Sequence, residues 1–359
     1  MNKQAVELAD KLCTTMMNRF APEELPPGGR WHYHQGVFLW GMYKLYEVTK
    51  NEKYYNYIKA YVDHNVHPDG QIHYGCEFDD AMTSVLLFPI YERTGEAKYR
   101  YTLDHCAKWI PMFFKTPSGG FWHKFNCVNQ MWLDGFYMAQ PLCVRYAVTF
   151  DTRKQEFFKM AYDQLRLMKK FTRDEKTGLW YHAYDESREA PWAHKETGTS
   201  PEFWGRAFGW IGCALVDILE LMPEDCEHRD YFTDTLRDYV QAVIRVQDDK
   251  SGMWYQVLNR VDDPKNWLET SCSCLFVYTI CKGMRLGLLD NRYMENMKRA
   301  FEGIKTKLTV TDSELLINDI CVGTGVGDYE FYIARPTTVN DLHGSGAFLH
   351  AMAELAQIL

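Results

Sequence analysis

Alternating helical segments run along the whole chain, and this alternation limits the folds that it can adopt. Amphipathic segments are predicted near 3–20, 52–65, 96–113, 153–172, 229–248 and 291–306. A more apolar segment follows each of them, near 35–49, 79–94, 132–149, 204–222, 268–287 and 342–358. A helix that is apolar on all sides is buried, whereas a helix with a polar stripe faces solvent. Six outer and six inner helices in alternation predict an all-α fold, an (α/α)6 barrel.

Repeated motifs support this organisation. Segments 46–54 and 91–99 align with each other and predict tight joints between an inner helix and the next outer helix. A second motif, a glycine turn followed by a short aromatic stretch that ends in His or Gln, occurs at 69–73, 119–123, 177–182 and 251–256. It predicts short strands or loops over one mouth of the barrel. Residues 1–359 are therefore interpreted as one domain, and Pro89 and Pro141 are expected to kink two inner helices.

Composition and charge exclude several classes of protein. The net charge is −8 and no basic block is present, which argues against a nucleic-acid partner. No apolar run is long enough to cross a membrane. The 11 cysteines are scattered, mostly in apolar context, and the first residues lack the apolar core of a signal peptide. A cytoplasmic protein, monomeric or homodimeric, is expected.

The predicted barrel gathers the first residues of its inner helices at one mouth, because these helices all run parallel. Free amides and helix dipoles make such a mouth favourable for an anion. The residues that open the inner helices are Tyr33, Asp79, Asp134, Trp204 with Arg206, Glu269 and His343.

Two carboxylates, Asp79 and Asp134, open neighbouring inner helices. An acid at this position can simply cap a helix, but two acids facing one pocket suggest glycoside chemistry. His123, Lys124 and His182 end or follow the repeated aromatic motifs and are candidates for hydrogen bonding to a ligand. Arg206 either clamps a substrate carboxylate or pairs with Asp134 or Glu202.

Motifs for metals and nucleotides are weak. His32-Tyr-His34 and Cys272-Ser-Cys274 are isolated pairs that lack the further ligands of a zinc site. No phosphate-binding or dinucleotide-binding fingerprint is present. The Gly323-Thr-Gly-Val-Gly327 segment is interpreted as an irregular loop lining the mouth.

Several of these motifs together resemble glycoside hydrolase family 105, the unsaturated rhamnogalacturonyl hydrolases, and the related family 88 of unsaturated glucuronyl hydrolases. The motifs are Trp132-Leu-Asp-Gly-Phe-Tyr-Met-Ala-Gln-Pro141, Trp204-Gly-Arg-Ala-Phe-Gly-Trp210, Phe78-Asp-Asp80, Gly178-Leu-Trp-Tyr-His182 and Asn340-Asp-Leu-His-Gly-Ser-Gly346. The resemblance implies an (α/α)6 barrel without metal or cofactor. It implies Asp134 as general acid and base and Asp79 as a second carboxylate. The residues that it implies for the sugar site are Tyr33, His123, Lys124, Trp132, His182, Arg206, Trp210 and His343.

The same resemblance implies an unusual reaction on an unsaturated uronyl disaccharide. The carboxylic acid of Asp134 would protonate C4 of the C4=C5 double bond, water would add at C5, and the resulting hemiketal would open and release the neighbouring sugar, rhamnose in this family. Such an acid needs a raised pKa, which the aromatic surroundings of Trp132 predict. The alternatives are an unsaturated glucuronyl hydrolase acting on glycosaminoglycan fragments, a sugar epimerase, and a carbohydrate-binding helical-repeat protein.

Overall fold

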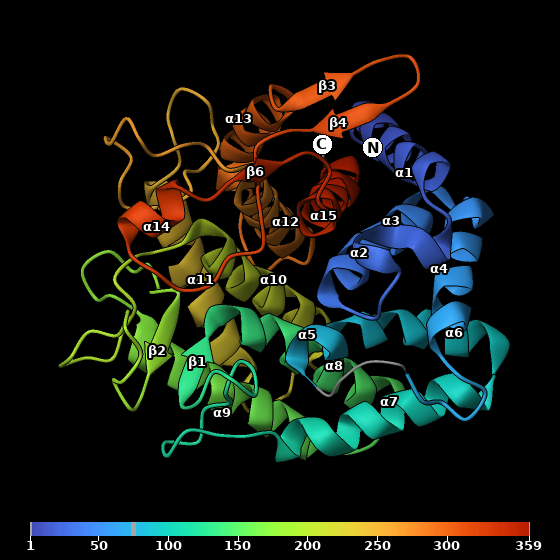
Figure 1. Ribbon diagram of the computed structural model, residues 1–359, viewed down its shortest axis with the longest axis horizontal. Coiled ribbons are helices and arrows are strands. Elements are labelled where there is room, and N and C mark those ends of the chain that lie inside the picture. The colour runs from blue at the N-terminus through green and yellow to red at the C-terminus, as the bar shows by residue number, and fades with distance from the viewer. Residues whose placement is uncertain (1, 73–76, 359) are drawn as a thin grey trace.

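The computed structural model describes residues 2–72 and 77–358, and its helices form two concentric rings (Figure 1). The outer ring consists of α1 (Lys3–Arg19), α4 (Glu52–Asn65), α7 (Ala97–Trp109), α9 (Lys154–Thr172), α11 (Arg229–Arg245) and α13 (Met294–Lys305). The inner ring consists of α3 (Tyr33–Thr49), α5 (Phe78–Ala81) with α6 (Leu87–Thr94), α8 (Leu133–Thr149), α10 (Gly205–Leu221), α12 (Thr270–Arg285) and α15 (Leu342–Ile358). The predicted (α/α)6 barrel is confirmed.

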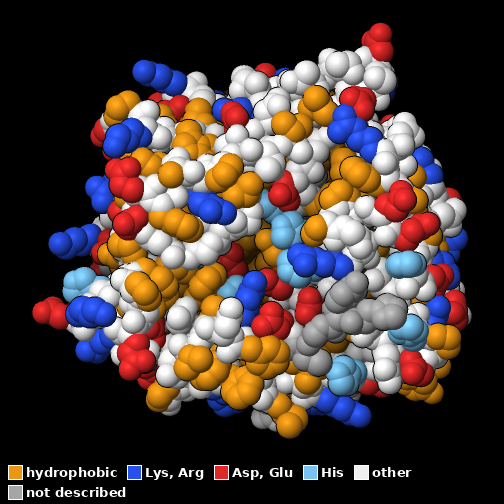
Figure 2. Space-filling view, in the orientation of Figure 1, with side chains coloured by type: hydrophobic (Ala, Val, Ile, Leu, Met, Phe, Trp, Pro, Cys, Tyr) orange, Lys and Arg blue, Asp and Glu red, His pale blue; other side chains and the backbone are white. Residues whose placement is uncertain are grey.

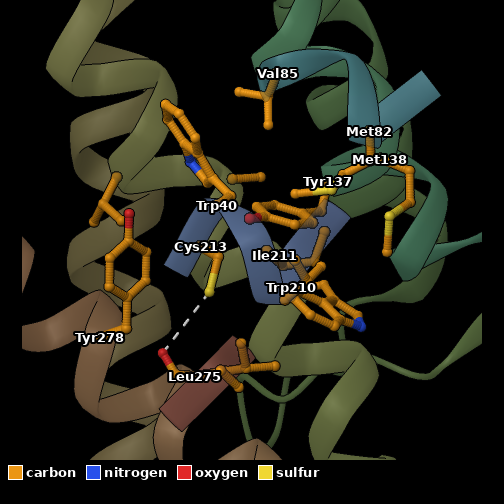
Figure 3. Close-up of a cluster of buried hydrophobic side chains, with 14 of the residues drawn as sticks. Trp40, Met82, Val85, Tyr137, Met138, Trp210, Ile211, Cys213, Leu275 and Tyr278 are labelled. Carbon is orange, nitrogen blue, oxygen red and sulfur yellow. Dashed lines mark hydrogen bonds between the residues drawn. The ribbon is translucent and has the colours of Figure 1, made fainter. Parts of the chain in front are cut away.

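Burial distinguishes the two rings as the hydrophobic pattern predicted. In α10 every residue from Gly205 to Leu219 is buried, and in α15 every residue from Leu342 to Ala356. Outer helices bury only one face, such as Phe157, Ala161 and Leu165 of α9. Apolar side chains from several inner helices meet inside the ring, where Tyr137 of α8 stacks on Trp210 of α10 (Figure 3). No helix among the described residues has the length and apolar character needed to cross a membrane.

The ring closes where its last inner helix packs on its first. Helix α15 contacts both α12 and α3, so the red and blue ends of the chain lie side by side in Figure 1. Glycines allow this close approach: a Cβ atom on Gly41 would lie 2.7 Å from the Cβ atom of Leu349, and one on Gly346 would lie 2.6 Å from the amide nitrogen of Phe38. The Asn2 amide also donates to the Ala356 carbonyl at 3.0 Å.

The second inner helix is the most irregular. A 3-10 segment, Met82–Leu86, separates α5 from α6. Pro89 lies just after it, lacks the N–H that would bond the Val85 carbonyl, and its ring crowds that carbonyl. The expected distortion at Pro89 is therefore found, whereas α8 continues without interruption through Pro141. Gly95 ends α6 in the left-handed conformation, with φ of 69°, as a helix C-terminus favours.

The repeated glycine–aromatic motifs form turns that follow the outer helices. Gly70, Gly119, Gly178 and Gly252 all have positive φ, and each turn is followed by an extended segment. His73, which ends the first motif, lies outside the described residues. The described strands form short antiparallel pairs: β1 (Gln130–Trp132) with β2 (Ala183–Asp185), β3 (Leu308–Val310) with β4 (Leu315–Ile317), and β5 (Ile320–Cys321) with β6 (Thr337–Thr338). Short helices α2 (Leu25–Gly28) and α14 (Tyr329–Ile333) lie between these elements.

Candidate active site

A cavity of about 430 Å³ opens at the N-terminal ends of the inner helices. The face of the molecule shown in Figure 2 is hollowed near its centre, where histidine, acidic and basic side chains gather. Six of the ten predicted site residues line the cavity: Tyr33, Asp79, His123, Lys124, Trp132 and Asp134. The loop at Gly323–Gly325 also lines it, as its glycine-rich sequence predicted.

Pairing of β1 with β2 brings Asp134 and His182 together. Trp132 pairs with Ala183 in the two strands, and the Leu133 amide donates to the His182 carbonyl at 3.0 Å. His182 immediately precedes β2 and Asp134 lies two residues after β1, so their side chains meet. The Nε2 atom of His182 lies 3.1 Å from Oδ2 of Asp134. A predicted catalytic acid and a predicted site histidine are therefore direct partners.

Tyr332 of α14 completes a chain of hydrogen bonds behind Asp134. Its hydroxyl lies 2.7 Å from Nδ1 of His182 and accepts from the Gly327 amide at 3.3 Å. The hydroxyl is then directed to donate to Nδ1, which leaves the ring proton on Nε2 to donate to Asp134. Sequence reasoning missed Tyr332, because α14 is a short helix in a segment without periodic pattern. Its only signal was its position after a loop already expected to line the mouth.

The Asp134 carboxyl does not have the raised pKa that its aromatic surroundings predicted. Burial by itself raises this pKa, but the charge and hydrogen bond of His182 and the charge of His123 outweigh burial. Together they hold the pKa of Asp134 below its usual range. The prediction considered the apolar ring of Trp132 and overlooked the two histidines on either side of it. In the free protein Asp134 is therefore a carboxylate.

Asp79, the second carboxylate that lines the cavity, forms an ion pair. Its Oδ2 atom lies 2.6 Å from Nζ of Lys124 and 3.8 Å from Nε2 of His32. Burial raises the pKa of Asp79, but His123, Lys124 and His32 together hold it below its usual range. Asp79 is thus an ionised carboxylate whose second oxygen is available to accept hydrogen bonds from a ligand.

Trp132 and His123 form a flat aromatic wall. Their rings stack with centroids 4.5 Å apart and planes 16° from parallel. The Trp132 indole N–H donates to Gln130 at 3.0 Å, which fixes the orientation of the ring. His123 is buried, and burial lowers its pKa to about 4. A neutral, rigid wall of this kind suits stacking against the apolar face of a sugar ring.

Three further predicted residues lie behind the cavity: Arg206, Trp210 and His343. Arg206 donates to the Cys321 and Val322 carbonyls, both at 2.7 Å, and lies 4.4 Å from the centroid of the Trp204 ring. The ion pair with Asp134 or Glu202, considered as the alternative to a substrate clamp, is not found in the described part of the chain, and Glu202 pairs instead with Arg260 at 2.9 Å. Arg206 therefore holds the 321–322 segment against α10.

Trp210 and His343 are also fully enclosed. Trp210 is only 1% exposed and packs on Tyr137 in the core. It follows Arg206 by about one helical turn, which directs it into the ring of helices instead of the mouth. His343 is buried at the start of α15, with Nε2 2.9 Å from the Cys321 carbonyl oxygen. Glu269, which opens α12, caps that helix by accepting from the Ser271 and Cys272 amides.

Comparisons with known proteins identify the family of the chain. Residues 8–359 match the family model described as Glycosyl Hydrolase Family 88. The chain is 34% identical to a solved glycoside hydrolase from family 105 of C. acetobutylicum ATCC 824, with a TM-score of 0.92 over 99% of this chain and 100% of that chain. It is 26% identical to the unsaturated rhamnogalacturonyl hydrolase YesR of Bacillus subtilis (strain 168), over 87% of this chain and 86% of the relative.

A further solved structure shares the fold at lower identity. It is a possible member of the GH105 family from Klebsiella pneumoniae subsp. pneumoniae MGH 78578, 23% identical, with a TM-score of 0.84 over 99% of this chain and 94% of that chain. The family model spans both rings of helices and all the cavity residues described above. The chain therefore belongs to Glycosyl Hydrolase Family 88, has the fold of the family 105 enzymes, and is a glycoside hydrolase.

Proposed function

We propose that this enzyme removes a terminal 4,5-unsaturated galacturonic acid from rhamnose-containing oligosaccharides produced by pectin or rhamnogalacturonan lyases. The observation that carries the proposal is the Asp134 carboxylate, directed into an aromatic cavity by the hydrogen-bonded chain from Tyr332 through His182. The similarity to YesR, named as an unsaturated rhamnogalacturonyl hydrolase, supports the choice of sugar.

Asp134 would act twice in the reaction. Its protonated form donates a proton to C4 of the double bond, and the positive charge that develops at C5 is taken up by water. The Asp134 carboxylate accepts the proton of that water, which regenerates the acid and leaves a hemiketal at C5. Opening of the ring then allows the bond to the neighbouring sugar to break.

Binding of the substrate would raise the pKa of the Asp134 carboxyl, as the acid role requires. An anionic uronate entering the cavity expels water and adds a like charge, and both effects raise the pKa of a nearby carboxyl. His182 would keep its Nε2 proton and only donate it in the 3.1 Å hydrogen bond to Oδ2, with the Tyr332 hydroxyl behind its Nδ1 atom, so the proton that Asp134 gives to C4 would be taken up from solvent. Asp79, kept ionised by Lys124, would accept hydrogen bonds from sugar hydroxyls, while Trp132 stacks on the flat unsaturated ring.

The proposal also includes the domain organisation, cellular location and oligomeric state of the enzyme. We infer one catalytic domain that acts in the cytoplasm as a monomer or homodimer on small imported oligosaccharides. Nine of the ten described cysteines are buried, as expected for thiols in a reducing compartment.

Loss of the ultraviolet absorbance of the unsaturated uronyl group tests the proposal. Purified enzyme is mixed with unsaturated galacturonyl-rhamnose, and Asp134→Asn is run beside it at equal concentration. We expect the wild type to remove the absorbance and release rhamnose, and the folded variant to lose nearly all turnover. Near-normal turnover by Asp134→Asn would remove this residue from the acid role.

A second substrate separates the alternatives. Loss of absorbance only with unsaturated glucuronyl disaccharides would keep the hydration chemistry and assign the enzyme to glycosaminoglycan-type fragments. Turnover of neither disaccharide would refute the proposed reaction and favour an epimerase or a carbohydrate-binding protein.

A further inference from the structure

Three side chains meet where the first and last inner helices close the ring. His34 lies in the first turn of α3, Asp341 immediately precedes α15, and His343 lies in the first turn of α15. One ligand atom from each lies within 4.8 Å of the others. Oδ1 of Asp341 is 2.8 Å from Nδ1 of His343 and 3.8 Å from Nε2 of His34.

The proton on His343 is located by its backbone partner. Nε2 lies 2.9 Å from the Cys321 carbonyl oxygen, which can only accept, so Nε2 carries the proton. In the neutral ring Nδ1 then presents a lone pair. This atom is buried, has no hydrogen-bond partner in the described structure, and points toward a carboxylate oxygen that also carries lone pairs. A cation between the two atoms would remove this repulsion.

A parallel argument applies to His34, through its neighbour His32. The Nδ1 atoms of the two rings lie 2.9 Å apart, so one of them donates to the other. Nε2 of His32 faces the Asp79 carboxylate at 3.8 Å, which favours the proton on that nitrogen and leaves its Nδ1 as acceptor. His34 must then donate from Nδ1 and present the lone pair of Nε2 toward Asp341.

We propose that His34, Asp341 and His343 bind a divalent transition metal ion of the Zn²⁺ type. Two imidazole nitrogens and one carboxylate are a ligand set that Zn²⁺ uses when one coordination position stays open. With bonds of about 2.0–2.1 Å, tetrahedral ligand atoms lie roughly 3.4 Å apart, and the observed 2.8 and 3.8 Å bracket that spacing. Because His34 lines the cavity, the open position faces the space that the substrate enters.

The proposed site differs from the interpretation of His32-Tyr-His34 as an isolated pair. The pair lacked further ligands along the sequence, but closure of the ring brings Asp341 and His343 to His34 from about 300 residues away. Metal binding by the free protein does not rest on the proposed reaction. An experiment can therefore refute the metal site without refuting the reaction, and the reverse.

Calorimetric titration of chelator-treated enzyme with ZnCl₂ tests the site. We expect one Zn²⁺ per chain, and a weakening by at least about 10-fold in His34→Gln and in Asp341→Asn, a loss of the size that even outer partners of a metal site cause. Both side chains are partly exposed, at 15% and 21%, so both variants are expected to fold. The exposed His194, whose Nδ1 atom accepts from amides of its own loop, provides the control His194→Gln, which should bind as the wild type does.

Cobalt gives a second, spectroscopic measurement on the same proteins. Co²⁺ held by two histidines and a carboxylate absorbs visible light, and this absorbance should appear in the wild type and in His194→Gln but not in the other two variants. Mg²⁺ at equal concentration should not compete, since nitrogen ligands disfavour it. Absence of binding by both ions, or equal binding by Asp341→Asn and the wild type, would overturn the proposal and leave a proton shared between His343 and Asp341.

Discussion

Replacing Tyr332 by phenylalanine removes one hydroxyl and leaves the ring in place. That hydroxyl makes the 2.7 Å bond to Nδ1 of His182 and accepts the Gly327 amide. His182 is fully buried, so water does not replace the lost donor. An unsatisfied buried acceptor costs about 1–3 kcal/mol. Moving the ring proton to Nδ1 does not recover this cost, because that N–H would face the phenylalanine ring without an acceptor and the Nε2 lone pair would face the Asp134 carboxylate.

The expected effect on catalysis follows from the free-energy cost of the unsatisfied Nδ1 atom of His182. If the full 1–3 kcal/mol applies to the transition state, kcat/KM for the unsaturated disaccharide falls by about 5- to 150-fold. The assay is loss of uronyl absorbance at several substrate concentrations. A second comparison tests whether Tyr332 acts through His182: Tyr332→Phe should add little to the loss already caused by His182→Gln.

A matched control separates this role from simple destabilisation. Tyr239 of α11 is also buried, and its hydroxyl donates to the Phe208 carbonyl at 3.0 Å, within the helix packing. Tyr239→Phe should lower the melting temperature while kcat/KM stays near the wild-type value. The reasoning is refuted if Tyr332→Phe keeps kcat/KM within about two-fold of the wild type, or if it slows His182→Gln by the same factor as it slows the wild type.

Two further predictions concern stability. Lys282 is fully buried and pairs with Asp217 at 2.6 Å and with Glu220 at 2.7 Å, so Lys282→Met should cost about 3–5 kcal/mol by removing the buried cation from both carboxylates; an unchanged urea midpoint would contradict this. Burial lowers the pKa of His123 to about 4 and that of His350 to about 3. The unfolded chain binds these protons below about pH 6.5 and the folded chain does not, so stability should fall as the pH drops from 6.5 toward 4, by at most ~1.4 kcal/mol per histidine and pH unit. Urea unfolding at pH 7 and pH 5 measures this, and His350→Gln should flatten the dependence.

The two rings of helices could be predicted because burial acts on every turn of each helix. The outer helix expected at 153–172 is observed at Lys154–Thr172, and the inner helix expected at 204–222 at Gly205–Leu221. A kink at Pro89 was expected, but its form, the 3-10 segment Met82–Leu86, was not, because that form depends on how one proline displaces a neighbouring carbonyl and not on periodicity.

The site could be predicted where its residues open inner helices or end the repeated glycine–aromatic motifs, as His123 does. Asp79 and Asp134 reach the cavity because parallel helices bring their first turns together. Trp210 does not, since one further turn carries its side chain into the core. The partners of Arg206 and His182 lie in the segment 321–332, whose path is set by contacts with distant helices and leaves no local pattern in the sequence.

Closure of the ring by α15 also sets the time at which the enzyme can become active. α15 begins about 300 residues after α3, and at 5–20 residues per second the ribosome needs roughly 15–60 s to cover that distance. During this interval the apolar face of α3 that α15 covers is exposed, including Gly41 and its neighbours. His34 likewise has neither Asp341 nor His343 beside it. A nascent chain stalled before residue 341 should therefore bind chaperones and show no turnover, however well the ring helices that precede α15 have formed.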